Sequence, residues 1–147
     1  PTDETAIPYG APAAVAGTPM DFSTPHLIGE RIDTDTDQLR WARGYDHTYI
    51  LDKELGKLAI ASRCSSPKTG IVMEVYTDQP GVQLYTGNWM SGNLRGKHDH
   101  RYPARAALCL ETQHYPDSPN KPEYPSTRLN PGETFRSTTI FRFTLEA

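Results

Sequence analysis

Several features that would assign a chain to a particular class are missing from this sequence. It has no run of about 18 apolar residues, the length that a membrane-spanning helix needs. Charged residues of both signs are interspersed, and the net charge of −3 leaves no basic stripe for the phosphates of a nucleic acid. The sequence therefore predicts neither a membrane nor a nucleic acid as a partner.

Cysteine is scarce, and its placement excludes several kinds of site. The two cysteines, Cys64 and Cys109, lie in a Ser-rich turn and in an apolar strand pattern, without the paired spacing of a zinc or redox motif. We expect two unlinked thiols. Because the chain also lacks an N-x-S/T sequon and a disulfide framework, we expect a cytoplasmic protein, with a periplasm as the alternative.

Long amphipathic helices are also missing. The 13 prolines and 11 glycines are spread along the chain, which favours short strands joined by turns. Residues 1–43 are rich in Pro, Ala, Thr and Asp and predict an extended arm, whereas residues 44–147 carry strand patterns. The chain opens with proline and shows no apolar leader, so we expect it to come from a longer precursor.

The strand patterns predict an all-β fold. Apolar residues alternate or cluster in "TYIL", "KLAIASR", "IVMEVYT", "GVQLYTG" and "ALCLETQ", and "TFRSTTIFRFTLE" alternates most clearly. In that last segment one face holds Phe135, Ser137, Thr139, Phe141, Phe143 and Leu145. We predict one domain, residues 1–147, that forms an antiparallel β-sandwich.

Two polar side chains interrupt these strands. A lone buried carboxylate costs several kcal/mol, so Glu111, next to Leu110, belongs either to a solvated surface or to a site. Gln83 lies between Val82 and Leu84 in the same way. If the two strands share a sheet, Gln83 and Glu111 open onto one face, and the nearby aromatic residues suit a sugar ring.

The histidines leave alternatives open. In "GYDHTYIL", Asp46 and His47 must point to opposite faces of a strand, so only one of them faces a site, and the spacing does not choose between them. His98 and His100 have an H-x-H spacing that suits a metal, but the surrounding charge favours an exposed loop. We therefore expect no metal.

Five motifs occur in order: "VAGTPMDF", "GYDHTYIL", "TDQPGVQLYTGN", "CLETQHYPDSPN" and "NPGETF". Together they resemble the C-terminal part of the galactose mutarotases (aldose 1-epimerases), from about Val15 through Phe135. The resemblance implies a galactose-mutarotase-like antiparallel β-sandwich. It also implies an open sugar cleft and no metal or organic cofactor.

The resemblance also implies roles for three residues. Glu111 matches the general base, Asp46 a ligand of sugar hydroxyls, and Gln83 a further sugar contact. His47 would then face away from the cleft. The N-terminal half of the family, which carries the general-acid histidine, has no counterpart here, so we expect an N-terminal portion of the same precursor as a separate chain.

The resemblance implies an aldose 1-epimerase that interconverts the α and β anomers of a free hexose such as galactose or glucose. We expect Glu111 to be held among apolar neighbours. One alternative is a non-catalytic carbohydrate-binding β-sandwich. Another is a relative that acts on a hexose 6-phosphate, for which a basic cluster is present: Arg95, Lys97, Arg101 and Arg105.

Overall fold

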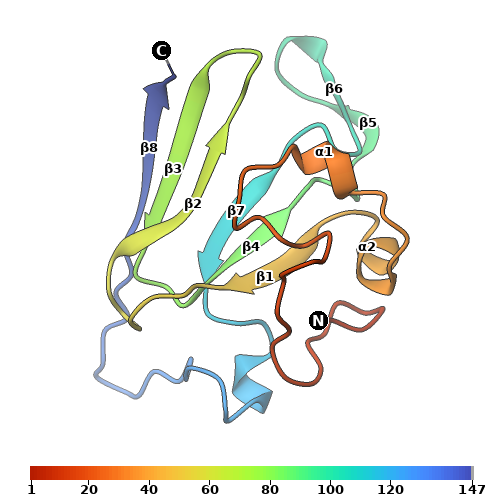
Figure 1. Cartoon of the computed structure of the whole chain (residues 1–147). Coiled ribbons are helices and arrows are strands. Elements are labelled where there is room, and N and C mark those ends of the chain that lie inside the picture. The colour runs from red at the N-terminus through yellow and green to blue at the C-terminus, as the bar shows by residue number, and fades with distance from the viewer. Residues whose placement is uncertain (147) are drawn as a thin grey trace. The chain divides into compact units, whose positions relative to one another are not determined.

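The computed structural model describes residues 1–146 and is mostly antiparallel β-sheet with few helices, which confirms the all-β prediction (Figure 1). Its strands are β1 Asp46–Ile50, β2 Ala59–Ser65, β3 Ile71–Thr77, β4 Gly81–Tyr85, β5 Ser91–Arg95, β6 Arg101–Pro103, β7 Cys109–Gln113 and β8 Thr139–Leu145. The helices are α1 Ile28–Arg31 and α2 Asp37–Ala42, with short 3-10 turns η1 Lys97–Asp99 and η2 Ser118–Asn120.

The strands form three small sheets. Their orders are β1-β4-β7, β2-β3-β8 and β5-β6. The successive strand patterns "KLAIASR" and "IVMEVYT" correspond to β2 and β3, which form an antiparallel pair. The hairpin of β5 and β6 was not predicted, because its sequence is dominated by charge rather than by alternating apolar residues.

The first 43 residues depart from the predicted extended arm. Two short helices follow the last proline of the arm, Pro25. The Thr36 side chain caps α2 by accepting a hydrogen bond from the backbone N–H of Leu39, and Leu39 is only 3% exposed. A helix of six residues is too short to produce a readable apolar stripe, which is why the sequence pattern missed it.

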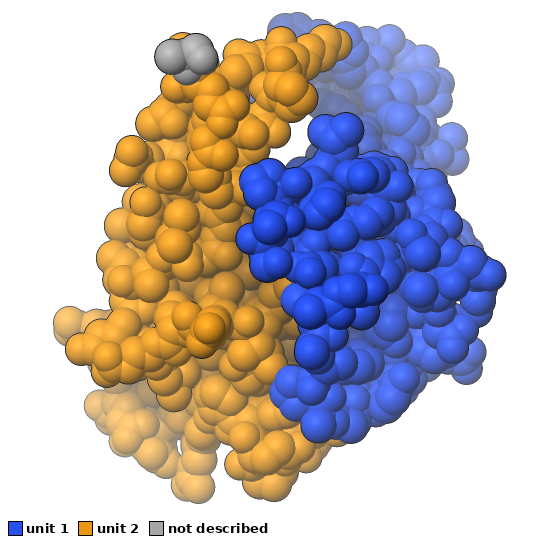
Figure 2. All heavy atoms as spheres, in the orientation of Figure 1, with its two compact units in different colours: residues 1–47, 84–109 blue, residues 48–83, 110–147 orange. Residues whose placement is uncertain are grey.

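The chain forms two compact units (Figure 2). Unit 1 comprises Pro1–His47 and Leu84–Cys109, and unit 2 comprises Thr48–Gln83 and the residues from Leu110 onward. The unit boundaries fall within β1, β4 and β7. Each unit has its own buried side chains.

Unit 1 is organised around Tyr45, which is fully buried. Its hydroxyl donates to the carbonyl of Pro19 at 2.9 Å, and its ring packs edge-to-face on Phe22 at 5.2 Å between centroids. The Asn88 amide donates to the carbonyls of Ala42 and Tyr45, both at 2.9 Å, and accepts from the Thr86 hydroxyl at 2.7 Å. One side chain therefore binds two backbone carbonyls at the connection between α2 and β1.

Unit 2 has β3 as the central strand of the β2-β3-β8 sheet. Val72 and Val75 of β3 are 2% and 0% exposed. A hydrogen bond of 2.6 Å between the hydroxyls of Thr112 and Thr139 joins β7 to β8. This contact ties two sheets together within the unit.

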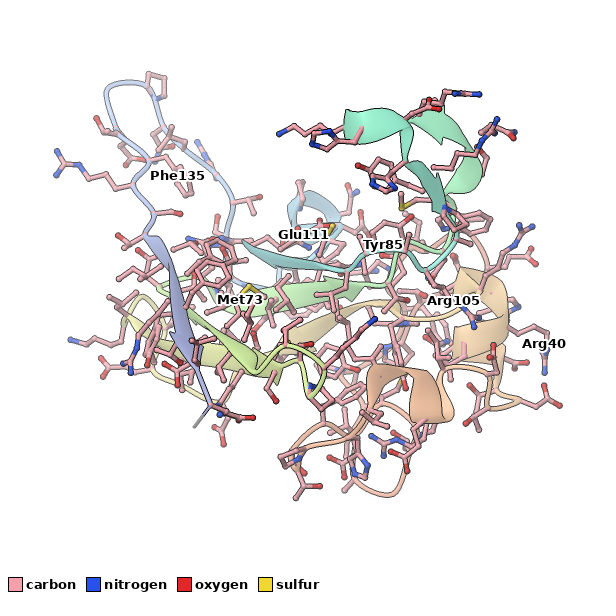
Figure 3. The ribbon with its side chains drawn as sticks, turned by 90° about the horizontal axis from the view of Figure 1, so that it is seen from above. Arg40, Met73, Tyr85, Arg105, Glu111 and Phe135 are labelled. Carbon is pink, nitrogen blue, oxygen red and sulfur yellow. The ribbon has the colours of Figure 1, made fainter. Side chains whose placement is uncertain are left out.

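The C-terminal strand differs from its prediction in length and in burial. β8 begins at Thr139, so the residues before it, including Phe135, lie outside any strand (Figure 3). Phe141, Phe143 and Leu145 share the predicted face, but they are 49%, 64% and 74% exposed. The alternation of β8 would favour burial of this face, but the face is exposed, because residues 1–146 place no layer over it.

We predict that Asn88→Ala lowers the free energy of unfolding by about 2–4 kcal/mol, because it removes three hydrogen bonds from a buried cluster, including the one that Asn88 donates to the Ala42 carbonyl. Urea unfolding followed by circular dichroism measures this loss. Asn93→Ala, at an exposed position of β5, serves as the matched control. A loss no larger than that of the control would show that Asn88 does not organise the unit.

Candidate functional site

The polar face of unit 2 follows from strand alternation. On β4, Val82 is 4% exposed and points to the buried side, so Gln83 points to the opposite face. On β7, Glu111 and Gln113 share one face, and Leu110 and Thr112 share the other. β4 and β7 are neighbours in one sheet, and two strands of one sheet can carry Gln83 and Glu111 on the same face.

Hydrogen bonds connect this face. The Nε2 of Gln113 donates to the hydroxyl of Thr48 at 3.4 Å, and that hydroxyl donates to Oε1 of Gln83. Because Gln113 shares its face of β7 with Glu111, the same face of the sheet carries Glu111, Gln83 and Thr48. The structure thus brings two of the predicted site residues together.

Glu111 lies on β7 and is exposed, as is Cys109 two residues before it (Figure 3). The neighbour Leu110 is half-buried and lies on the opposite face of the strand. The expected apolar enclosure of Glu111 is therefore not formed by residues 1–146, because adjacent residues of a strand point to opposite faces. The carboxylate is accessible from solvent.

Asp46 belongs to unit 1 and is half-buried. Its backbone N–H donates to Nδ1 of His47 at 3.1 Å. His47 is only 7% exposed, and burial lowers its pKa from 6.5 to about 4. Asp46 and His47 take opposite faces of β1, and the histidine is the buried member of the pair.

The tautomer of His47 follows from this contact. Because Nδ1 accepts a hydrogen bond, the neutral ring carries its proton on Nε2. Nε2 is buried and has no hydrogen-bond partner within residues 1–146. His47 is therefore a neutral side chain at pH 7 and is not exposed to a bound molecule.

The basic cluster lies in unit 1, and its arginines have partners. Arg105 donates to both carboxylate oxygens of Asp33 at 3.0 and 2.7 Å, and Arg95 pairs with Asp99. Arg101 donates to the carbonyl of Gly92 at 3.4 Å. A pocket of about 210 Å³ in the same unit is lined by Arg105 and Asp33 among others. Much of the positive charge is thus balanced locally.

No group of three or more metal-ligating side chains gathers anywhere in the described part of the chain. His98 and His100 are exposed in and beside the η1 turn. Cys64 and Cys109 are free thiols, and burial raises the pKa of Cys64. Among the residues described, no helix is long and apolar enough to cross a membrane.

Comparison with known proteins identifies the family. A family model described as aldose 1-epimerase matches residues 1–142. The chain belongs to the aldose 1-epimerase family. It is 43% identical over 145 residues to a galactose mutarotase of Mus musculus and 36% identical over 149 residues to an aldose 1-epimerase of Escherichia coli.

Solved structures of aldose epimerases share the fold. The chain matches an aldose epimerase homologue from C. elegans with a TM-score of 0.83 at 26% identity, covering 99% of this chain and 42% of that one. A galactose 1-epimerase from Lactobacillus acidophilus matches with a TM-score of 0.74 at 25% identity, covering 41% of its chain. These matches confirm the galactose-mutarotase-like fold that the motifs implied.

The epimerases matched are longer than this chain. The match covers 99% of the chain but 41% of the mouse mutarotase and 42% of the E. coli epimerase. The family model also extends beyond the motifs from which the resemblance was inferred, at both ends.

The sequence pattern assigns no site role to Thr48, which belongs to the apolar segment "TYIL", or to Gln113. The alternation of "ALCLETQ" places Gln113 on the same face as Glu111, but it does not show which side chain Gln113 contacts. No sequence signal could have joined Thr48 to Gln113, because their hydrogen bond links residues 65 positions apart.

The buried His47 predicts a specific acid sensitivity. Its folded pKa of about 4 lies below the unfolded value of 6.5, so the unfolded state binds the proton first as the pH falls. The stability associated with neutral His47 is complete above pH 6.5 and is lost between pH 6.5 and 4. The total loss is about 3 kcal/mol, at about 1.4 kcal/mol per unit of pKa.

Urea unfolding at a series of pH values from 7 to 4 tests this prediction. His47→Gln should flatten the pH dependence in that window, while the exposed-site control His98→Gln should keep the wild-type slope. Equal slopes in wild type and His47→Gln would contradict it.

Proposed function

We propose that this chain is the C-terminal part of a mutarotase-like β-sandwich domain and carries the general base and two sugar ligands of an aldose 1-epimerase. Family membership supports the reaction class. The single observation that favours a site here is the shared face of Gln83 and Glu111 in unit 2, with hydrogen bonds that organise it. The substrate proposed is a free hexose such as galactose or glucose.

The proposed reaction needs one base and one acid. The Glu111 carboxylate takes the proton from the anomeric hydroxyl while an acid protonates the ring oxygen, and the C1–O5 bond of the hemiacetal breaks to give the open aldehyde. Rotation about C1–C2 and reclosure on the other carbonyl face give the second anomer, with the proton transfers reversed. Such positioned acid-base groups typically contribute about 10²–10⁴-fold each.

The other two residues orient the sugar in this proposal. Gln83 donates and accepts hydrogen bonds as an amide, and Asp46 accepts them as a carboxylate. Either residue discriminates between sugars, because an analogue without the matching hydroxyl leaves a polar group unpaired. Exposed Glu111 can reach a hydroxyl without displacing protein atoms.

The general acid must be a residue other than His47. With a pKa of about 4 and 7% exposure, His47 carries no second proton at neutral pH and does not reach a bound sugar. His114 lies just past the end of β7, and its Nδ1 lies 2.8 Å from Oε1 of Gln79.

We propose that the acid comes from an N-terminal portion of the same family fold. Two observations on this chain support a further layer of protein. The Glu111 carboxylate is exposed rather than enclosed, and the apolar face of β8 is open, with Phe143 and Leu145 at 64% and 74% exposure. Exposed apolar faces of this kind mark contact surfaces.

We predict that a chimera of the mouse mutarotase, in which this chain replaces the matching segment, equilibrates α-galactose in a polarimeter. Glu111→Gln in this chimera should lower kcat by about 10²–10⁴-fold, because an amide cannot take the proton. The 147-residue chain alone should give the uncatalysed rate.

The exposed loop variant Glu123→Gln provides the matched control and should leave the rate unchanged. Equal rates for the chimera and its Glu111→Gln variant would exclude Glu111 as the base. Sugar binding without any mutarotation in the unaltered chimera would favour the second reading, a non-catalytic carbohydrate-binding sandwich.

We predict that galactose 6-phosphate binds no more tightly than a free hexose, so its inhibition constant should be no lower than that of the free sugar. The arginines Arg95 and Arg105 already pair with Asp99 and Asp33, so they offer little charge to a phosphate. Inhibition constants from the same polarimetric assay test this. A preference of tenfold or more for the phosphorylated sugar, abolished by high salt, would instead support the hexose 6-phosphate reading.

A further inference from the structure

We infer that Thr48, supported by Gln113, is a positioning residue that holds the amide of Gln83 for the sugar. The inference rests on the proposed function, because Gln83 is a sugar ligand only there. It adds a role for two residues that neither the motif nor the family membership assigns. All three side chains belong to unit 2.

The hydrogen bonds run in one direction through the three side chains. Gln113 Nε2 donates to Thr48 Oγ1 at 3.4 Å, and Thr48 Oγ1 donates its single hydrogen to Gln83 Oε1. A hydroxyl has one donor, so accepting from Gln113 leaves that hydrogen for Gln83. Each of the three strands β1, β4 and β7 contributes one member of this chain of hydrogen bonds.

Packing holds Thr48 in place. A Cβ added at Gly81 would lie 2.9 Å from Cγ2 of Thr48 and 3.2 Å from ring carbons of Tyr115, so the methyl of Thr48 fills the space that a larger residue at position 81 would need. Tyr115 is itself packed edge-to-face on Tyr124, with ring centroids 5.3 Å apart. A β-branched side chain confined in this way keeps one χ1 rotamer, so its hydroxyl keeps one direction.

The orientation of the Gln83 amide follows. With Oε1 directed at Thr48, the two N–H groups of Nε2 are directed to the other side of the amide. N–H groups suit the hydroxyl and ring oxygens of a sugar, which accept hydrogen bonds. A long glutamine side chain loses rotamer freedom when it binds, and a contact that fixes it beforehand reduces that cost.

Thr48→Val tests this role, because valine keeps the shape and removes the hydroxyl. In the mutarotase chimera we expect KM for galactose to rise about 5–10-fold with kcat within about twofold, as expected when a contact made equally in ground and transition state is weakened. Thr48→Ser keeps the hydroxyl and should restore most of the wild-type KM. Thr144→Val, at an exposed position of β8, is the matched control.

A spectroscopic measurement on the 147-residue chain tests the same role without activity. The ¹⁵N relaxation of the Gln83 side-chain amide should show greater mobility in Thr48→Val than in wild type, and wild-type mobility in Thr48→Ser and Thr144→Val. The thermal midpoint of each variant checks the fold.

The two measurements separate the two proposals. If the unaltered chimera lacks mutarotation, the proposed function fails, while the relaxation data still decide whether Thr48 holds Gln83. Unchanged mobility of the Gln83 amide in Thr48→Val overturns the inference, as does a KM equal to wild type. Equal effects of valine and serine at position 48 also overturn it, because they would indicate a general packing role.

Discussion

β4 lies between β1 and β7, and the rest of the candidate site depends on this pairing. A central strand forms backbone hydrogen bonds along both of its edges. Its side chains therefore point, in alternation, to one face of the sheet or to the other. One face buries Val82, and the other carries Gln83. Once that choice is made, strand pairing places the polar side chains of the neighbouring strands on the same face. The positions of the side chains in the candidate site thus follow from the geometry of the sheet.

The acid and the histidine in "GYDHTYIL" are separated by the same geometry. His47 takes the buried side of β1, where desolvation keeps it neutral, and its Nδ1 binds the backbone of Asp46. A neutral histidine that accepts a hydrogen bond from the neighbouring backbone stabilises the strand rather than the reaction. The polar interruption of the strand therefore combines a packing role for His47 with the sugar-binding role proposed for Asp46.

The exposed parts of unit 2 are consistent with a site that needs more protein around it. The apolar residues of β8 are accessible to solvent, although their residue types favour a covered environment, and Glu111 is exposed as well. The aldose epimerases matched are more than twice as long as the segment they share with this chain. In the proposed function this additional protein supplies both the cover and the general acid.

The sequence by itself determined the strand class and the family, because alternation and short motifs are local properties of neighbouring residues. The strand patterns located β2, β3 and β4, and the resemblance assigned Asp46, Gln83 and Glu111 to one site. The patterns missed α2, because the Thr36 cap stabilises a helix in a segment whose composition favours turns. Tertiary structure alone decided which side chains touch. The contact of Thr48 with Gln83 and Gln113 joins positions 35 and 65 residues apart, and the exposure of a strand depends on what packs against it, which no local pattern records.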